Sequence, residues 1–329
     1  MNLLSTIPRY TLGFFPTPLM RLPNLEKLLG GPRLFIKRDD QTGLGLGGNK
    51  TRKLEYFMGD AFAKGADCII TAGAAQSNHC RQTAAAAAAC RMECHLVLGG
   101  SAPENVNGNL LLDLLFGAKL HWSGEMRKGE NIEEIAEQLN RQGKKTYIIP
   151  YGGSNETGAT GFVAAMFELK LQLKSMGETI SHIVFASSSG GTHSGMLLGK
   201  AELNESYHLI GINIDKDETF GMTLKEYIPF LANKTAHHLG SHQTFNNTDI
   251  DLNCDYYGKG YGVVGELERE AISLIARNQG ILLDPVYTGR AMGGLLDMIR
   301  KGRFSSKDSV LFWHTGGSPA LFSHADKLI

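Results

Sequence analysis

The feature that most constrains the fold is the alternation, along nearly the whole chain, of short apolar segments with longer segments of helical periodicity. Such alternation is typical of parallel sheets, because two parallel strands need a crossover connection long enough to hold a helix. We therefore predict an α/β fold whose open parallel sheets carry helices on both faces. Eight segments have the length and composition of buried strands: LFIK (34–37), CIITAG (68–73), CHLVLGG (94–100), KLHW (119–122), TYIIPY (146–151), HIVFAS (182–187), HLIGINI (208–214) and SVLFWHTGG (309–317).

Helices are predicted between these strands. In residues 51–65 (TRKLEYFMGDAFAKG) apolar side chains recur at the spacing of one helix face, and the final glycine is a stop signal. The run 83–90, mostly alanine, predicts a tightly packed helix, whereas residues 215–255 are interpreted as either an excursion near a site or a connecting region. The face of 51–65 predicted to be buried consists of Leu54, Phe57, Met58, Ala61 and Phe62.

The composition favours a site for a small molecule. A chain of 329 residues, 42% hydrophobic and 20% charged, suits one large α/β domain or two ordinary domains. Lys plus Arg and Asp plus Glu both number 33, so no net charge attracts nucleic acid or an acidic membrane. The sequence has no run of about 18 apolar residues and no signal-peptide pattern at its N-terminus. We expect a cytoplasmic protein without nucleic-acid or membrane partners.

The five cysteines argue against both a disulfide framework and a metal site. Their number is odd and no CxxC pair occurs, which fits reduced, buried thiols. Cys90 and Cys94 have the spacing to face each other on a helix, but no nearby histidine completes a zinc set. No metal site is therefore expected.

The loop GLGLGGNKTRK (43–53) combines four glycines with three cations. Its glycines satisfy GxGxxG, but the acidic residue that a dinucleotide fold needs at the end of the next strand is missing, and Asn49 interrupts the Walker pattern. The cations Lys50, Arg52 and Lys53 fall in the first turn of a helix that we expect Asn49 to cap, where the helix dipole disfavours each by about 0.3–1 kcal/mol. Either they are solvated, or an anion lies nearby, or one lysine is deprotonated and reactive.

Two further strand ends lead into helices with polar first turns. TAGAAQSNHCRQTAA (71–85) places Ser77 and Asn78 at a helix start, which is either a plain N-cap or a site for a carboxylate or phosphate. ASSSGGTHSGM (186–196) offers serines, glycines and Thr192 without an acidic residue, as a phosphate needs.

Six motifs occur along the chain: IKRDD (36–40), GGNKTRKLEY (47–56), QSNHCRQTAA (76–85), SGGTHSG (189–195), LLDPVYTG (282–289) and HTGG (314–317). Their order and spacing resemble those of the pyridoxal-phosphate enzymes of the 1-aminocyclopropane-1-carboxylate deaminase and D-cysteine desulfhydrase family. The resemblance implies a tryptophan synthase β-like fold (fold type II), with a larger domain (1–50 and 156–329) and a smaller one (51–155) that close over the cofactor, in a homodimer.

The resemblance also implies the residues that bind pyridoxal 5'-phosphate. Lys50 is similar to the lysine that forms a Schiff base with the cofactor, and Lys53 to a partner of its phosphate. Asn78 is expected at the ring hydroxyl, and Thr315 at the pyridine nitrogen. The cup for the phosphate is expected to consist of Ser189, Gly190, Gly191 and Thr192.

The substrate side of the site is implied in the same way. Ser77, Asn78 and the amides around His79 are expected to hold the substrate carboxylate. Tyr261 and Tyr287 are expected over the substrate, as residues that handle protons or the leaving group. One departure is that GYGVV (260–264) lacks the proline that the family usually has in this loop.

Two positions separate the branches of this family. The cyclopropane-opening deaminases have VYEG and HLGG where this chain has VYTG and HTGG, so Thr288, expected beside the substrate, and Thr315 match the desulfhydrase pattern. The resemblance therefore implies a lyase that converts D-cysteine and water to pyruvate, sulfide and ammonia by α,β-elimination. Three alternatives stay open: an L-cysteate sulfo-lyase, a 1-aminocyclopropane-1-carboxylate deaminase, and a non-catalytic protein that binds the cofactor or an amino acid.

Overall fold

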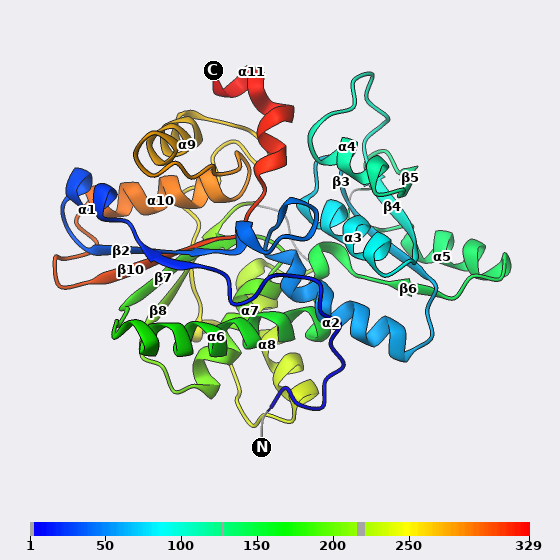
Figure 1. Cartoon of the computed structure of the whole chain (residues 1–329), viewed down its shortest axis with the longest axis horizontal. Helices are drawn as coiled ribbons and strands as arrows, with labels where there is room; N and C mark the ends of the chain where they lie inside the picture. The colour runs from blue at the N-terminus through cyan, green and yellow to red at the C-terminus, as the bar shows by residue number, and fades with distance from the viewer. Residues whose placement is uncertain (1–2, 127, 216–220) are drawn as a thin grey trace.

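The computed structural model describes residues 3–126, 128–215 and 221–329, which form two sheets side by side (Figure 1). In these residues the larger sheet has six strands in the order β1-β2-β10-β7-β8-β9, and its neighbours are parallel except for β1 and β2. The smaller sheet has the order β5-β4-β3-β6 and is parallel throughout. The strands are β1 (Leu19–Arg21), β2 (Arg33–Arg38), β3 (Cys68–Ala74), β4 (Glu93–Gly99), β5 (Lys119–Trp122), β6 (Thr146–Ile148), β7 (His182–Ser187), β8 (His208–Asn213), β9 (Asp251–Asn253) and β10 (Ser309–His314).

Helices cover both faces of the larger sheet, with α1, α9 and α10 on one side and α6, α7 and α8 on the other (Figure 1). The α-helices are α1 (Pro23–Leu29), α2 (Lys50–Ala63), α3 (Asn78–Ala89), α4 (Gly108–Leu115), α5 (Ile132–Arg141), α6 (Glu156–Met176), α7 (Gly191–Glu202), α8 (Leu224–Leu239), α9 (Glu266–Gln279), α10 (Thr288–Arg300) and α11 (Ala325–Leu328). The 3₁₀ turns are η1 (Asp39–Gln41), η2 (Leu44–Leu46), η3 (Tyr151–Gly153), η4 (Asn247–Asp249) and η5 (Ser318–His324). Among the helices of the described residues, none is long and apolar enough to cross a membrane.

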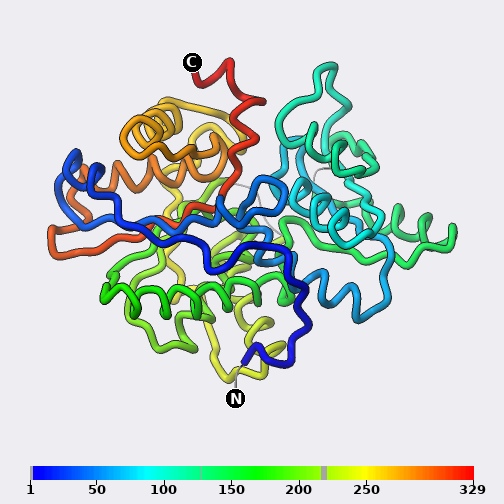
Figure 2. The backbone as a smooth tube through the Cα atoms, viewed as in Figure 1, coloured from blue at the N-terminus to red at the C-terminus, as the bar shows by residue number. Residues whose placement is uncertain are grey.

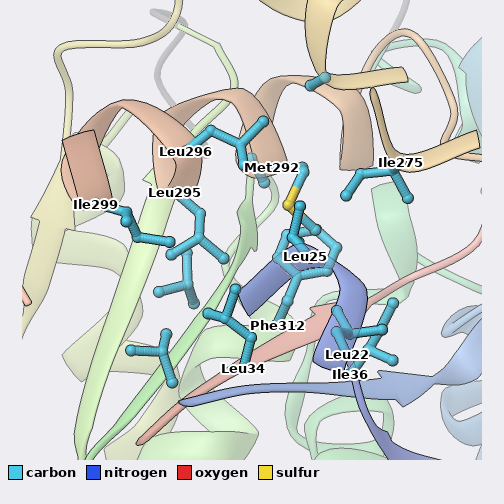
Figure 3. Close-up of a cluster of buried hydrophobic side chains, with 14 of the residues drawn as sticks. Leu22, Leu25, Leu34, Ile36, Ile275, Met292, Leu295, Leu296, Ile299 and Phe312 are labelled. Carbon is cyan, nitrogen blue, oxygen red and sulfur yellow. The ribbon is translucent and has the colours of Figure 1, made fainter. Parts of the chain in front are cut away.

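We call the six-stranded sheet with the helices that cover it the larger unit, and the four-stranded sheet with its helices the smaller unit. The core of the larger unit consists of apolar side chains packed between helices and strands. Figure 3 shows one half of it, where Met292 and Leu295 of α10 pack over Ile36 of β2 and Phe312 of β10. All four side chains are almost fully buried. Burial of such a side chain stabilises a fold by about 1.5–3 kcal/mol, so this packing holds α10 firmly against the strands of the larger sheet.

The predicted α/β class is confirmed, and all eight predicted strands are present. The sequence missed β1 and β9, which are edge strands of three residues each. It also missed α8 in the region 215–255, because Pro229 lies inside that helix. Residues 216–220 of that region lie outside the described residues. The proposed domain bounds, 1–50 with 156–329 and 51–155, stay a prediction.

Two details of the sequence interpretation were wrong. Four of the five apolar residues chosen for the inner face of α2 are fully buried, but Phe62 is 43% exposed and packs against the ring of Tyr10 instead. Of the five free cysteines, four are buried as predicted, whereas Cys254 is exposed. In the described residues, no group of three or more metal-ligating side chains has the geometry to hold a metal ion.

A buried ion network joins the first turn of α2 to the larger unit. Arg52 is bonded through Nε and Nη2 to the two carboxylate oxygens of Asp39, at 2.9 and 2.8 Å, and through Nη1 to Glu168 of α6 at 2.8 Å. The indole of Trp313 in β10 also donates to Asp39 at 2.8 Å, and Lys37 of β2 contacts Glu168. The guanidinium of Arg52 is therefore a structural cation and is not available to a ligand.

The pKa of Glu168 reflects this network. Burial alone would raise it, but the hydrogen bonds and charges of Arg52 and Lys37 outweigh burial and hold the pKa at about 2. The stability contributed by Glu168 is therefore present above its unfolded pKa, about 4.3, and is lost as the pH falls toward 2.

We predict that Arg52→Met lowers the free energy of unfolding by about 3–5 kcal/mol at pH 7, because it leaves buried carboxylate charge without its partner. Denaturant titration of the free energy of unfolding measures this. The matched control is Arg21→Met, which removes the exposed pair with Glu26 and should change stability little. The difference between Arg52→Met and the wild type should shrink below pH 4, and an equal loss in both variants would contradict the structural role.

Candidate active site

The largest concentration of predicted site residues surrounds one cavity between the two sheets. Its empty volume is about 650 Å³, counted out to its open mouth. The carboxyl ends of β3, β7 and β10 contribute to its wall, which is where ligands bind in parallel α/β sheets. The wall consists of Asn49, Lys50, Ser77, Asn78, His79, Tyr151, Gly152, Ala186, Ser187, Ser188, Ser189, Gly190, Thr192, His193, Tyr287 and Thr315.

Helices α2, α3 and α7 begin at this cavity, at Lys50, Asn78 and Gly191. The first amides of a helix have no partner within the helix, and the dipole makes that end positive. Converging helix starts therefore make this cavity a site for anionic groups.

Segments far apart in the sequence meet at this cavity. The chain trace in Figure 2 shows the glycine loop (blue) next to the end of β10 (red). The contact between them includes a hydrogen bond of 2.9 Å, from the Asn49 amide to the Thr315 carbonyl.

Lys50 lies half-buried on the cavity wall. Its Nζ donates to the carbonyl of Gly152 at 2.8 Å, and burial lowers its pKa to about 8. About one tenth of this amine is therefore uncharged at pH 7, far more than for an ordinary lysine, and the uncharged form is the nucleophile. Gly152 has a φ of +64°, and a Cβ at this position would lie 2.4 Å from the Ser189 hydroxyl, so the turn that presents its carbonyl to the lysine requires glycine.

Lys53 lies behind the wall. It is fully buried, and burial followed by the charge of Lys50 lowers its pKa well below the usual value. Its Nζ donates to the same Gly152 carbonyl at 3.2 Å. A Cβ on Gly191 would lie only 2.8 Å from this Nζ, so the amine sits directly against the start of α7. The predicted phosphate partner thus stands beside the predicted phosphate cup.

The predicted phosphate cup, Ser189 to Thr192, lies at the start of α7. Gly190 occupies the N-cap position with a φ of +81°, and a Cβ there would meet the ring of Tyr227. The Thr192 hydroxyl accepts from the side chain of Asn49 at 3.1 Å. Asn49 occupies the N-cap position of α2 as predicted, but its side chain makes no capping hydrogen bond and instead holds the hydroxyl of Thr192.

The start of α3 serves both as a cap and as a cavity wall. Ser77 is the N-cap residue, and its hydroxyl accepts from the Cys80 amide at 3.2 Å. The Thr71 hydroxyl donates its one hydrogen to the Ile149 carbonyl at 2.7 Å, so it accepts from His79 Nε2 at 2.8 Å. His79 Nδ1 is then a buried acceptor, and in the described residues it has no partner. Burial and the two lysines lower the pKa of His79, which keeps the ring neutral.

Two tyrosines form a hydrogen-bonded pair, and only one of them reaches the cavity. Tyr287 lies on the wall, and its hydroxyl is 2.6 Å from that of Tyr261, which is not among the residues of the wall. Burial raises the pKa of Tyr287 well above its usual value. The Tyr287 phenol therefore keeps its proton and can donate it, and Tyr261 can replace that proton.

Thr315 and Thr288 differ in their relation to the cavity. Thr315 lies on the wall, as expected. Thr288 is fully buried outside it, and its hydroxyl donates to Asp284 at 2.7 Å. Asp284 also accepts from the amide of Tyr287 at 3.0 Å. The contact of Thr288 with substrate therefore stays a prediction, and in this structure its hydroxyl is bonded to Asp284 in the turn that precedes Tyr287.

The turn after β6 is part of the cavity wall, although it was not predicted from the sequence. Tyr151 and Gly152 line the cavity, and the Ser154 hydroxyl donates to that of Ser189 at 2.8 Å and accepts from the Gly191 amide. The signal was present as GGSN (152–155), which follows a predicted strand and precedes a helix. His193, also on the wall, is neutral, because burial lowers its pKa to about 3.

Comparison with known proteins agrees with this geometry. The family model described as pyridoxal-phosphate dependent enzyme matches residues 10–316. A relative from Klebsiella pneumoniae (strain 342), described as D-cysteine desulfhydrase, is 42% identical over 327 residues, which cover 98% of this chain and 97% of the relative.

Solved structures support the same assignment. A structure described as an ACC deaminase homologue is 40% identical, with a TM-score of 0.89, and the match covers 99% of this chain and 97% of that one. A structure described as a threonine deaminase from T.th. is 18% identical over 92% of both chains with a TM-score of 0.63, which shows the shared fold.

The side chains at the cavity fit pyridoxal phosphate. Lys50 offers a partly neutral amine for the aldehyde, and the start of α7, with Lys53 behind it, offers amides and a hydroxyl for the phosphate. Thr315 supplies a neutral hydroxyl on the cavity wall. The chain belongs to the family of pyridoxal-phosphate dependent enzymes.

Proposed function

We propose that this protein is a lyase that eliminates sulfide from D-cysteine and yields pyruvate and ammonia. The observation that carries the proposal is the placement of the half-buried Lys50 amine and the protonated Tyr287 phenol on the wall of one cavity. An α,β-elimination needs these two groups, a base for the α-proton and an acid for the leaving sulfur. The relative described as D-cysteine desulfhydrase supports the choice of substrate.

The cofactor, when bound, supplies an electron sink for the negative charge that develops at the substrate α-carbon. The helix start at Ser77, Asn78 and His79 binds the substrate carboxylate, because its free amides and dipole favour an anion. This contact orients the α-proton toward Lys50.

The chain's own residues then move two protons. The Lys50 amine takes the α-proton, the carbon–sulfur bond breaks with its electron pair on sulfur, and Tyr287 donates a proton to the sulfur. Tyr261 restores the Tyr287 proton across their 2.6 Å hydrogen bond. The unsaturated amine that remains hydrolyses to pyruvate and ammonia.

We also propose a homodimer, which is what the family resemblance suggests, and a cytoplasmic location, which fits the free cysteines. The alternative with the most support is ring opening of 1-aminocyclopropane-1-carboxylate, because a solved relative is described as a homologue of that deaminase. An L-cysteate sulfo-lyase would use the same elimination with sulfite as the leaving group.

Lys50, and not Lys53, is predicted to carry the cofactor. Lys50 reaches the cavity, whereas Lys53 lies behind its wall. After borohydride reduction of the protein loaded with pyridoxal phosphate, mass spectrometry should place the pyridoxyl group on Lys50. The modification on Lys53 or Lys37 would refute the assignment.

Replacing Thr192 with Ala is predicted to weaken cofactor binding about tenfold to a hundredfold, because a hydrogen bond to a charged group contributes about 1.5–3 kcal/mol. The dissociation constant, measured by fluorescence during dialysis, reports this. The matched control is Thr235→Ala, which removes a buried hydroxyl that bonds Leu231 within α8 and should leave cofactor binding unchanged. Full cofactor occupancy in Thr192→Ala would show that the phosphate cup is elsewhere.

The two threonines are predicted to favour elimination over ring opening. The wild type should release sulfide from D-cysteine and little 2-oxobutyrate from the cyclopropane acid, because neither threonine supplies the charge or the proton of a carboxylate. The Thr288 hydroxyl is bonded to Asp284 outside the cavity wall, and the Thr315 hydroxyl on the wall is neutral. A group positioned for acid–base work contributes about 10²–10⁴-fold in rate. Thr288→Glu with Thr315→Leu should shift the product ratio toward 2-oxobutyrate.

The single variant Thr315→Leu separates the effect of this position from that of Thr288, since only Thr315 of the two threonines lies on the cavity wall. Equal wild-type turnover of both substrates would contradict the proposal. Sulfite release from L-cysteate that exceeds sulfide release would redirect it to the sulfo-lyase.

A further inference from the structure

A residue of α4, outside every motif considered above, contacts the candidate active site. Asn109 is fully buried in the first turn of α4. Its Nδ2 donates to the backbone carbonyl of Gln76 at 2.9 Å and to the Oδ1 of Asn78 at 2.9 Å. Its own amide donates to the side chain of Gln76 at 2.8 Å. The side chain of Asn109 therefore spans the turn that leads into α3.

These contacts determine which way two side-chain amides face. The Gln76 carbonyl can only accept, so the Asn109 atom beside it must be Nδ2. Because Nδ2 donates, the Asn78 atom beside it must be the acceptor Oδ1. The Nδ2 of Asn78 is left on the opposite side. One backbone carbonyl thus fixes the orientation of both amides.

The Nδ2 of Asn78 faces the end of β10. A Cβ on Gly317 would lie 2.6 Å from it, and Asn78 lies on the cavity wall. Within the described segments, no hydrogen bond from this Nδ2 is present, so its two hydrogens are available to an acceptor. An anionic oxygen bound in the cavity is such an acceptor.

Asn109 does this at a cost to the fold. Its Oδ1 is buried, and the described residues include no partner for it. A buried acceptor without a partner is destabilising, and an apolar residue of similar shape would avoid that loss. Packing alone therefore does not account for an asparagine here, whereas the two bonds from its Nδ2 do.

We propose that Asn109 is a positioning residue that keeps Nδ2 of Asn78 directed into the cavity, as a donor to the ring oxygen of the bound cofactor. The proposal rests on the proposed function only for the identity of the cofactor. It extends the site to α4, a helix of the smaller unit that contributes no residue to the cavity wall.

The test is a pH titration of the visible absorption band of the protein loaded with pyridoxal phosphate. The ring oxygen is conjugated to the group whose protonation changes this band, and a donor on that oxygen stabilises its negative charge and lowers the pKa of the change. Asn109→Asp places a carboxylate oxygen where Nδ2 stood. The Asn78 amide should then turn over, with its Oδ1 in the cavity.

The midpoint of the titration should therefore rise by about one pH unit in Asn109→Asp, a tenfold gain in proton affinity. Asn109→Leu, which is neutral and also lacks the donor, should shift it in the same direction by less. If Asn109→Asp does not fold, Asn109→Leu decides the question on the same measurement.

The matched control is Gln76→Ala. It removes the hydrogen bonds of the Gln76 side chain, one from the Asn109 amide and two to the carbonyl and side chain of Asn107, and leaves the Asn109–Asn78 bond intact. A merely structural role for Asn109 predicts that Gln76→Ala and the Asn109 variants lose thermal stability without a shift in the midpoint. A wild-type midpoint in whichever Asn109 variants fold would overturn the proposal.

The result of the titration does not depend on which substrate the enzyme uses. If the wild type shows the band but does not release sulfide from D-cysteine, the proposed function fails and the titration still decides the role of Asn109. A shifted midpoint with normal sulfide release supports the positioning role and leaves the proposed function intact.

Discussion

The buried bonds of Arg52 to Asp39 and Glu168 are the interaction on which the rest of the site depends. They tie the first turn of α2 to the larger unit, and that turn carries Lys50 and Lys53. Three cations at a helix start oppose the helix dipole, and the structure resolves this conflict in two ways. Arg52 keeps its charge because two carboxylates surround it, and the two lysines have lowered pKa values because burial disfavours their charge. Residues 50–53 thus combine a rigid attachment of α2 to the larger unit with the partly neutral amine of Lys50.

The anion-binding character of the cavity follows from the topology of the sheets. Strand ends from both sheets meet at one place, so α3 from the smaller unit and α7 from the larger unit direct their first amides at the same volume. Glycine is needed where a backbone approaches closely, as at Gly152 beside Ser189 and at Gly191 beside Lys53. The same arrangement suits a phosphate on one side and a substrate carboxylate on the other, with the amine of Lys50 between them.

Local signals in the sequence predicted the strands and most of the cavity wall. They were visible because an apolar strand, a polar turn and the start of a helix follow one another within one short segment of the chain. The failures concern interactions between residues far apart in the chain. Asn49 looks like a cap, but its side chain holds the hydroxyl of Thr192, which lies 143 residues further along the chain. The contact from Asn109 on α4 leaves no local pattern at all. Side-chain direction at these positions is set by tertiary packing, which periodicity and propensity do not encode.

The central claim is that Lys50 is the base that removes the α-proton in this cavity, and exchange of that proton can be measured without elimination. D-alanine has no leaving group at its β-carbon, so the protein loaded with pyridoxal phosphate should only exchange its α-proton for deuterium in heavy water, which proton NMR detects. We predict exchange with the wild type and loss of exchange with Lys50→Ala reconstituted with the cofactor. Undiminished exchange by Lys50→Ala, or none by the cofactor-loaded wild type, would contradict the account.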